Sequence, residues 1–184
     1  QAYEIGYNPT AVIPTTPLSD GTTFNVPRNV TVLLDAGAVF KMHKSSIIVG
    51  SISQGLDRSG GALQILGTPE QSVYFTAYRD ETLGSDSAPL RTDPLRGDWG
   101  GVVFRNDLDL DFINDYDPAS GLMPRVIDET QGIYRNYVNH ADIRYGGGKV
   151  NVAGEEGVYA PIHMIDARPT ITYNKITKSA DAAM

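Results

Sequence analysis

The chain has 184 residues, of which 41% are hydrophobic and 20% charged, a composition typical of a folded domain with its own core. The 22 acidic and 15 basic residues give a net charge of −7, which leaves no basic stripe for nucleic acid or an anionic membrane surface. Cysteine is absent, which excludes disulfides, thiolate metal sites and a cysteine nucleophile. No apolar run approaches 18 residues, so we expect no membrane insertion.

Short apolar runs rich in β-branched and aromatic residues occur along the whole chain, and almost all of them end in Gly, Pro, Asn or Asp. This pattern is typical of strands and turns, whereas long amphipathic helices are hard to find. The expected strands cover residues 29–34, 38–42, 45–50, 61–67, 72–78, 100–106, 137–145, 161–166 and 169–177. The sequence therefore predicts an all-β fold.

Internal similarity indicates how these strands are arranged. "YVNHADIRYGG" (137–147) aligns without a gap with "TITYNKITKSA" (170–180), which matches Val138 with Ile171 and Ile143 with Ile176. Strand-turn-strand units that recur with few tight-hairpin signals favour a parallel β-helix, in which each coil stacks its apolar side chains on those of the next.

Asparagine at the ends of these strands suits such a coil. We expect Asn174 to turn inward, with its amide bonded to the backbone of the neighbouring coil.

The predicted organisation is one β-helix with decorations. Residues 1–19 form an N-terminal linker or cap segment, and residues 20–184 form the coil. Polar stretches without an apolar period are expected to project as inserted loops near residues 79–98, 113–131 and 146–157.

Several stretches resemble a known kind of protein region: "DGTTFNVPRNVTVLLDAGAVFKM", "RSGGALQILGTPEQSVYFTAYRDE", "GDWGGVVFRND" and "NHADIRYGGG…PIHMIDARPTITYNKITKSADAAM". They are similar to the right-handed parallel β-helix (solenoid) region of very large bacterial secreted or cell-surface proteins, which has a pectate-lyase-like fold. The resemblance covers nearly the whole chain from about Asp20 onward. It implies an extracellular or cell-surface location and, because the coil of relatives continues past "SADAAM", further β-helix coils of a parent protein as partners. It implies a fold far more than a chemistry.

The segment "GDWGGVVFRNDLDLDFINDYD" (97–117) contains the strongest candidate for a cation site. Alternation with apolar residues would place three of its carboxylates on one strand face, where a bound cation would relieve their repulsion. Phe112 and Pro118 exclude an EF-hand loop. The candidate calcium ligands are Asp107, Asp109, Asp111, Asp115 and Asp117. The favoured interpretation is nevertheless a solvated acidic loop that keeps a strand edge from pairing.

Aromatic residues suggest a second candidate site. An exposed aromatic ring can stack on a sugar, so cell-surface glycans are candidate ligands of Trp99, Tyr134, Tyr137 and Tyr145. Trp99 also has a structural interpretation, because the two glycines after it suit close backbone packing beneath a large buried ring.

Catalytic signals are sparse. There is no adjacent Asp-Asp pair of the kind used by inverting β-helix hydrolases, and Glu155 and Glu156 stand in a Gly-rich loop. Asp142 and Arg144 share one strand face, as a base with its charge partner or as a plain ion pair. We therefore expect a non-catalytic structural or adhesive role. The alternative is a carbohydrate-binding or polysaccharide-cleaving module.

Overall fold

The computed structural model describes residues 2–6, 23–53, 56–84, 93–109, 128–152, 155–158 and 160–184. In these ranges the chain is all-β apart from a short 3-10 helix, η2 (Asp128–Gln131). No helix in the described ranges is long and apolar enough to cross a membrane.

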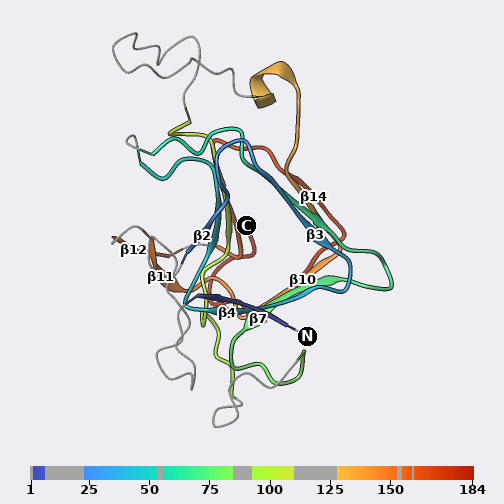
Figure 1. Ribbon diagram of the computed structural model, residues 1–184. Coiled ribbons are helices and arrows are strands. Elements are labelled where there is room, and N and C mark those ends of the chain that lie inside the picture. The colour runs from blue at the N-terminus through green and yellow to red at the C-terminus, as the bar shows by residue number, and fades with distance from the viewer. Residues whose placement is uncertain are drawn as a thin grey trace.

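Thirteen strands form three parallel sheets, which lie on the three sides of a triangle (Figure 1). Sheet 1 has the order β1 (Tyr3–Gly6), β4 (Val39–His43), β7 (Val73–Ala77), β10 (Ala141–Arg144), β15 (Lys175–Thr177). Sheet 2 has the order β2 (Phe24–Asn25), β5 (Ile47–Val49), β8 (Val102–Arg105), β13 (Ile162–Ile165). Sheet 3 has the order β3 (Thr31–Asp35), β6 (Ala62–Leu66), β9 (Tyr137–Asn139), β14 (Thr170–Thr172).

From β2 onward the chain visits sheets 2, 3 and 1 in rotation, and we call each set of three consecutive strands a layer. The four layers are β2-β3-β4, β5-β6-β7, β8-β9-β10 and β13-β14-β15. After β15 the chain returns to sheet 2, because the carbonyl of Ala183 accepts a hydrogen bond (3.2 Å) from the N–H of Ile162. The predicted alignment of the two repeats is confirmed: Val138 pairs with Ile171 and Ile143 with Ile176.

The interior of the triangle holds the hydrophobic core. Alternate residues of each strand point inward, as the pleat of a strand requires. Along sheet 1 the inward rings of Tyr3, Phe40 and Phe75 stack with centroids 5.3 and 5.2 Å apart, and Trp99 follows at 6.3 Å. Neighbouring layers are therefore joined by ring-to-ring packing as well as by backbone pairing.

Residues in the left-handed conformation mark the corners between strands. Among the described residues, seven that are not glycine have φ between 45° and 62°, and none of them lies inside a strand: Asn29, Lys44, His140, Tyr145, Asp166, Tyr173 and Lys178. His140 and Tyr173 divide the expected strands 137–145 and 169–177 in two, so the prediction of single strands there is wrong. A left-handed residue turns the chain from sheet 3 into sheet 1 within one or two residues.

The prediction for Asn174 is confirmed. Its side-chain oxygen accepts a hydrogen bond from the N–H of Ala141, and its amide nitrogen donates to the carbonyl of Val138, both at 2.8 Å. Both partners belong to the preceding layer, so this one amide supports the corner between sheets 3 and 1.

Three of the four longest connections leave from the corner between sheets 1 and 2, namely 7–23, 78–101 and 145–161. The fourth, 106–136, joins sheet 2 to sheet 3. The last connection of the first group contains an antiparallel hairpin, β11 (Lys149–Val152) and β12 (Glu155–Val158), which stands outside the three sheets (Figure 1).

The structure places two of the three expected loops at that corner. The described parts of 79–98 and the hairpin segment 146–157 both follow a strand of sheet 1. Of the expected loop 113–131, only η2 lies within the described residues. The expected linker or cap 1–19 contributes β1, which pairs with β4 in sheet 1.

Candidate functional site

The outer face of sheet 1 gathers buried charge. Four charged residues are buried in the described part of the chain, and three of them, Lys41, Asp80 and Asp142, lie on this side. Because Phe40 and Met42 point into the core, strand alternation sends Lys41 outward between them.

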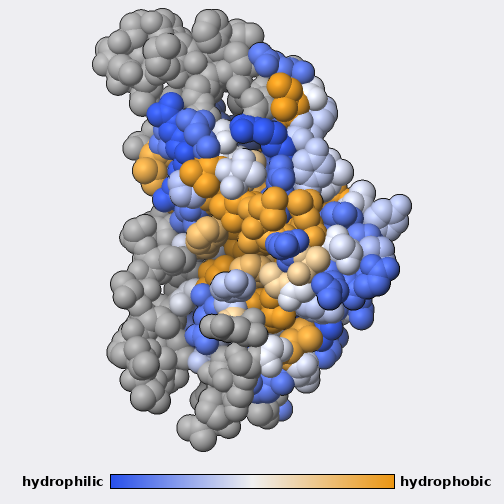
Figure 2. All heavy atoms as spheres, turned by 45° about the vertical axis from the view of Figure 1, so that its right-hand side comes forward, coloured by the Kyte–Doolittle hydropathy of each residue, from blue (hydrophilic) through white to orange (hydrophobic). Residues whose placement is uncertain are grey.

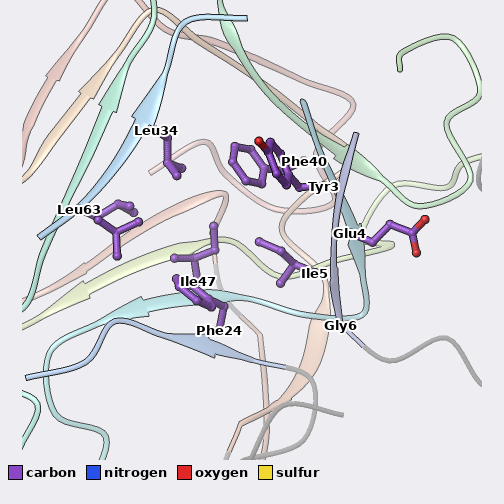
Figure 3. Close-up of a pocket in the computed structure, with 10 residues that line it drawn as sticks. Tyr3, Glu4, Ile5, Gly6, Phe24, Leu34, Phe40, Ile47 and Leu63 are labelled. Carbon is purple, nitrogen blue, oxygen red and sulfur yellow. The ribbon is translucent and has the colours of Figure 1, made fainter. Parts of the chain in front are cut away.

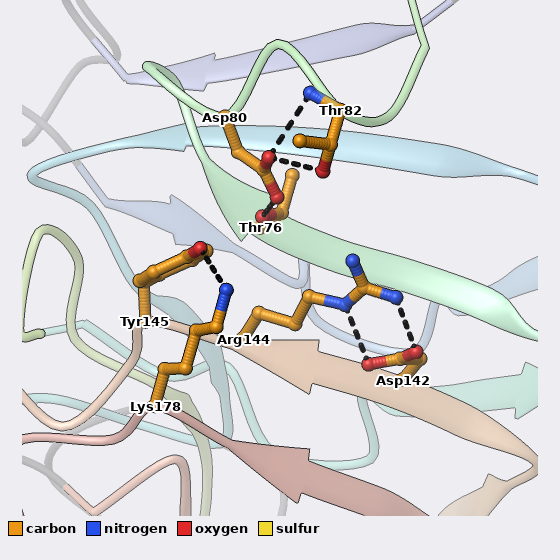
Figure 4. Close-up of polar contacts among 7 residues, drawn as sticks. All are labelled: Thr76, Asp80, Thr82, Asp142, Arg144, Tyr145 and Lys178. Carbon is orange, nitrogen blue, oxygen red and sulfur yellow. Dashed lines mark hydrogen bonds and ion pairs between the residues drawn. The ribbon is translucent and has the colours of Figure 1, made fainter. Parts of the chain in front are cut away.

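The loop after β7 is fastened to this face through Asp80. Its carboxylate accepts hydrogen bonds from the hydroxyl of Thr76 (2.6 Å), the hydroxyl of Thr82 (2.5 Å) and the N–H of Thr82 (3.1 Å) (Figure 4). Thr76 belongs to β7, so the carboxylate joins the loop to the strand that precedes it.

The same loop also covers β4. The ammonium of Lys41, which is fully buried, lies 3.4 Å from a carboxylate oxygen of Glu81. A Cβ atom at Gly84 would lie 3.3 Å from a methyl group of Val39, which shows how closely the loop packs. We call the polar groups on this face the sheet 1 polar cluster: Lys41, Thr76, Asp80, Glu81, Thr82, Asp142 and Arg144.

Asp142 and Arg144 form a bidentate ion pair along β10 (Figure 4). The two N–O distances are 2.9 and 2.7 Å, and Asp142 is only 6% exposed. The hydrogen bonds to Asp142 raise the pKa of the Arg144 guanidinium, which also lies 6.0 Å from the ring centroid of Tyr74. The ion-pair interpretation of these residues is therefore confirmed.

Asp80 is held in its charged form. Burial alone would raise the pKa of this carboxyl, but the hydrogen bonds from Thr76 and Thr82, with the charge of Arg144, outweigh burial and lower it. A general acid needs a raised pKa and access to substrate, and Asp80 has neither. The cluster is thus a buried clamp for the loop.

Trp99 is fully buried, so the prediction that it offers a face to a sugar is wrong and its predicted burial is confirmed. Gly101, one of the two glycines expected beneath the ring, instead lies against the carbonyl of Ala160. The indole N–H of Trp99 donates to the carbonyl of Arg144 at 2.7 Å. A Cβ at Gly146 would lie 3.4 Å from the indole ring, so the backbone approaches it closely.

The aromatic residues of the predicted glycan site do not form one exposed surface. Tyr145 adjoins the buried Trp99, because its chain neighbours Arg144 and Gly146 both lie against the indole. Tyr145 is 7% exposed, and its ring lies beneath the ammonium of Lys178, 4.7 Å from the ring centroid. Tyr137 is half-buried in β9 of sheet 3, and Tyr134, at 40% exposure, lies just before that strand. These residues therefore belong to two different sides of the triangle.

The prediction that the carboxylates alternate along a strand is also wrong for residues 107–109, the part of that stretch that the structure describes. The N–H of Asp109 donates to the carbonyl of Asn106 (3.0 Å), which closes a turn after β8, as Asn and Asp favour. Asp107 pairs with Arg105 through two bonds of 2.8 and 2.6 Å, whereas Asp109 accepts the N–H of Ser51 at 2.8 Å. The two carboxylates thus serve different partners.

The other candidate calcium ligands, Asp111, Asp115 and Asp117, lie outside the described residues. Within the described ranges, no group of three or more His, Asp or Glu side chains could hold a metal ion. The calcium interpretation stays a prediction.

Sequence reasoning missed a cavity at the end of the molecule that carries β1, which we call the β1 end. It has a volume of about 340 Å³ and opens into the triangle between the three sheets (Figure 3). Side chains of all three sheets line it, among them Ile5, Phe24, Leu34 and Phe40. The sequence signal for it was the alternation of Tyr3 and Ile5 with Glu4 in "YEIG" (3–6), which is typical of a strand with one apolar face.

The polar cluster was also missed. A lone lysine inside the apolar run "AVFKM" was a signal for it, but its partner Glu81 comes from a loop whose course the sequence does not reveal.

No family model, curated protein or solved structure matches this chain. The fold places three parallel sheets around an apolar interior, and the polar cluster lies on the outer face of one of them.

Proposed function

We propose that this chain is a segment of a right-handed parallel β-helix that serves a non-catalytic structural or adhesive role in a large secreted or cell-surface bacterial protein. The observation that carries the proposal is the rotation of consecutive strands through three parallel sheets around one apolar interior. Such stacking gives a rigid rod with a repeat of about 4.8 Å per layer.

The chemistry of the outer faces supports a scaffold. The charged groups of the sheet 1 polar cluster bind one another and secure a loop, and Trp99 is packed inside. The long connections that share one corner are suited to displaying variable segments, because loops on a rigid framework carry contacts with partners.

A direct test uses the whole chain. It is incubated with neutral and acidic polysaccharides, and both retention and newly formed sugar ends are measured. We expect no cleavage. Any retention should be lost when the hairpin 149–158 is replaced by a short glycine turn but not in Asp142→Asn.

Cleavage that disappears in Asp142→Asn, while thermal unfolding stays cooperative, would overturn the scaffold proposal in favour of a polysaccharide-cleaving module. Retention that survives the hairpin replacement would move the adhesive surface to another part of the chain.

A further inference from the structure

At the β1 end of the molecule, the described residues fill one side of three in the outermost layer. β1 pairs with β4 and extends sheet 1 by one strand, whereas sheets 2 and 3 end with β2 and β3 in the described residues. The position above β3 is therefore level with β1 and continuous with a pairing that the molecule already makes.

Apolar side chains face this position. Val32 and Leu34 of β3 point inward and are half-buried, and with Ile5 of β1 they line the 340 Å³ cavity (Figure 3). The ring of Tyr3 ends the aromatic stack of sheet 1 and is 62% exposed. Figure 2, which brings sheet 3 forward, shows apolar residues gathered in the middle of the surface with hydrophilic residues around them.

The backbone of β3 also presents hydrogen-bonding groups there. The carbonyl of Val30 accepts the N–H of Ala62 on β6. Because alternate residues of a parallel strand address opposite edges, the N–H groups of Thr31, Leu33 and Asp35 point away from β6. An edge that no described strand pairs with, beside an apolar cavity, is a template for one more strand.

We propose that this edge receives an edge strand of an adjoining β-helix segment, which lies parallel to β3 in the layer of β1 and places apolar side chains in the cavity. The inference rests on the proposed function and names the partner of that scaffold. Its recognition is by backbone pairing, with apolar residues required at alternate positions.

The register of the existing layers defines the probe. Three residues (36–38) connect β3 to β4, and Tyr3 pairs with Phe40. A copy of residues 31–37, Thr-Val-Leu-Leu-Asp-Ala-Gly, appended directly before Gln1 of the full chain, has the spacing needed to lie above β3. The matched control, Val-Thr-Leu-Asp-Leu-Ala-Gly, has the same composition but places polar side chains inward.

Amide hydrogen exchange and thermal unfolding provide the test. We expect the in-register extension to slow exchange of the Thr31, Leu33 and Asp35 amides at least tenfold and to raise Tm by several degrees, and the control to do neither. Equal effects of both extensions, or none, would overturn the proposal. So would amides already protected in the unextended monomer, or protection that appears with dimerisation in sedimentation, because another occupant would then cover the edge.

The amides of Leu63 and Val73, which pair inside the stack, distinguish the two levels of failure. If they are protected while the extension has no effect, only the docking proposal fails. If they exchange freely in the unextended chain, the layered scaffold itself is wrong.

Discussion

The side chain of Asn174 accepts a hydrogen bond from the backbone N–H of Ala141, one layer away, at 2.8 Å. The corner between β14 and β15 thus supplies a side-chain acceptor for the first backbone N–H of β10. A single residue type at a corner can therefore decide how well two layers hold together.

Asn174→Ala should lower the free energy of unfolding by about 1–3 kcal/mol, because it leaves two partly buried backbone groups without a partner. Urea denaturation measures the loss. The control is Thr172→Ala, whose hydroxyl bonds to Asn139 at an exposed position and should cost less than about 1 kcal/mol. Equal losses in the two variants would contradict the bridging role of Asn174.

Trp99 offers a spectroscopic check, because it is the only tryptophan and is fully buried. Its native emission should lie at short wavelength, resist quenching by iodide and shift to longer wavelength on unfolding. The control combines Trp99→Phe with Tyr134→Trp, which moves the indole to an exposed position and should give strong quenching. Ready quenching of the wild-type protein would place Trp99 at the surface.

Asp109 and Asp107 should differ in their effect on stability. Asp109→Ala removes the buried acceptor of the Ser51 N–H and should cost about 1–3 kcal/mol. Asp107→Ala breaks an ion pair at the surface and should cost less than about 1 kcal/mol. Chemical denaturation with calcium and with excess chelator measures both. A calcium-dependent stability that either substitution abolishes would show that these carboxylates bind the cation.

Acid should release the loop that covers sheet 1. The pKa of Asp80 is lower in the folded chain than in the unfolded chain. The charged carboxylate therefore adds its full contribution to the free energy of unfolding above the ordinary pKa of about 3.9, and this contribution is lost as the pH falls through the lower pKa of the folded chain. In Asp80→Asn, the free energy of unfolding should therefore fall less steeply with decreasing pH when it is measured from pH 6 downward. Asp93→Asn, at an exposed position, controls for the loss of one carboxylate, and an equally shallow decrease there would contradict the assignment.

The sequence predicted those parts of the fold that depend on local pattern. β-branched alternation placed most strands, and the gapless repeat gave the register of Val138 on Ile171, because stacked layers need apolar residues at equivalent positions. The short strands β1 and β2 were missed, because two to four residues are too few to show an alternating pattern. Left-handed His140 and Tyr173 were missed because few non-glycine residues adopt that conformation, and the enrichment of histidine there is too weak to locate a corner.

The candidate sites were harder to predict. The burial of Trp99 was predicted from its sequence neighbours, although the glycine that lies against its ring is the distant Gly146. The polar cluster joins Lys41 to a loop forty residues later, and only the tertiary fold brings them together. Residues 107–109 form a turn although their sequence alternates like a strand, because the turn lets the carboxylate of Asp109 accept a buried hydrogen bond from the N–H of Ser51.

The long connections that share the corner between sheets 1 and 2 have an evolutionary consequence. Pairing between layers is set by the strands themselves, so residues can be gained or lost in these connections without shifting the register of the core. The sequence of the connections at this one corner can thus diverge rapidly while the three sheets are conserved. A chain built this way can change what it presents to its surroundings and still keep its shape.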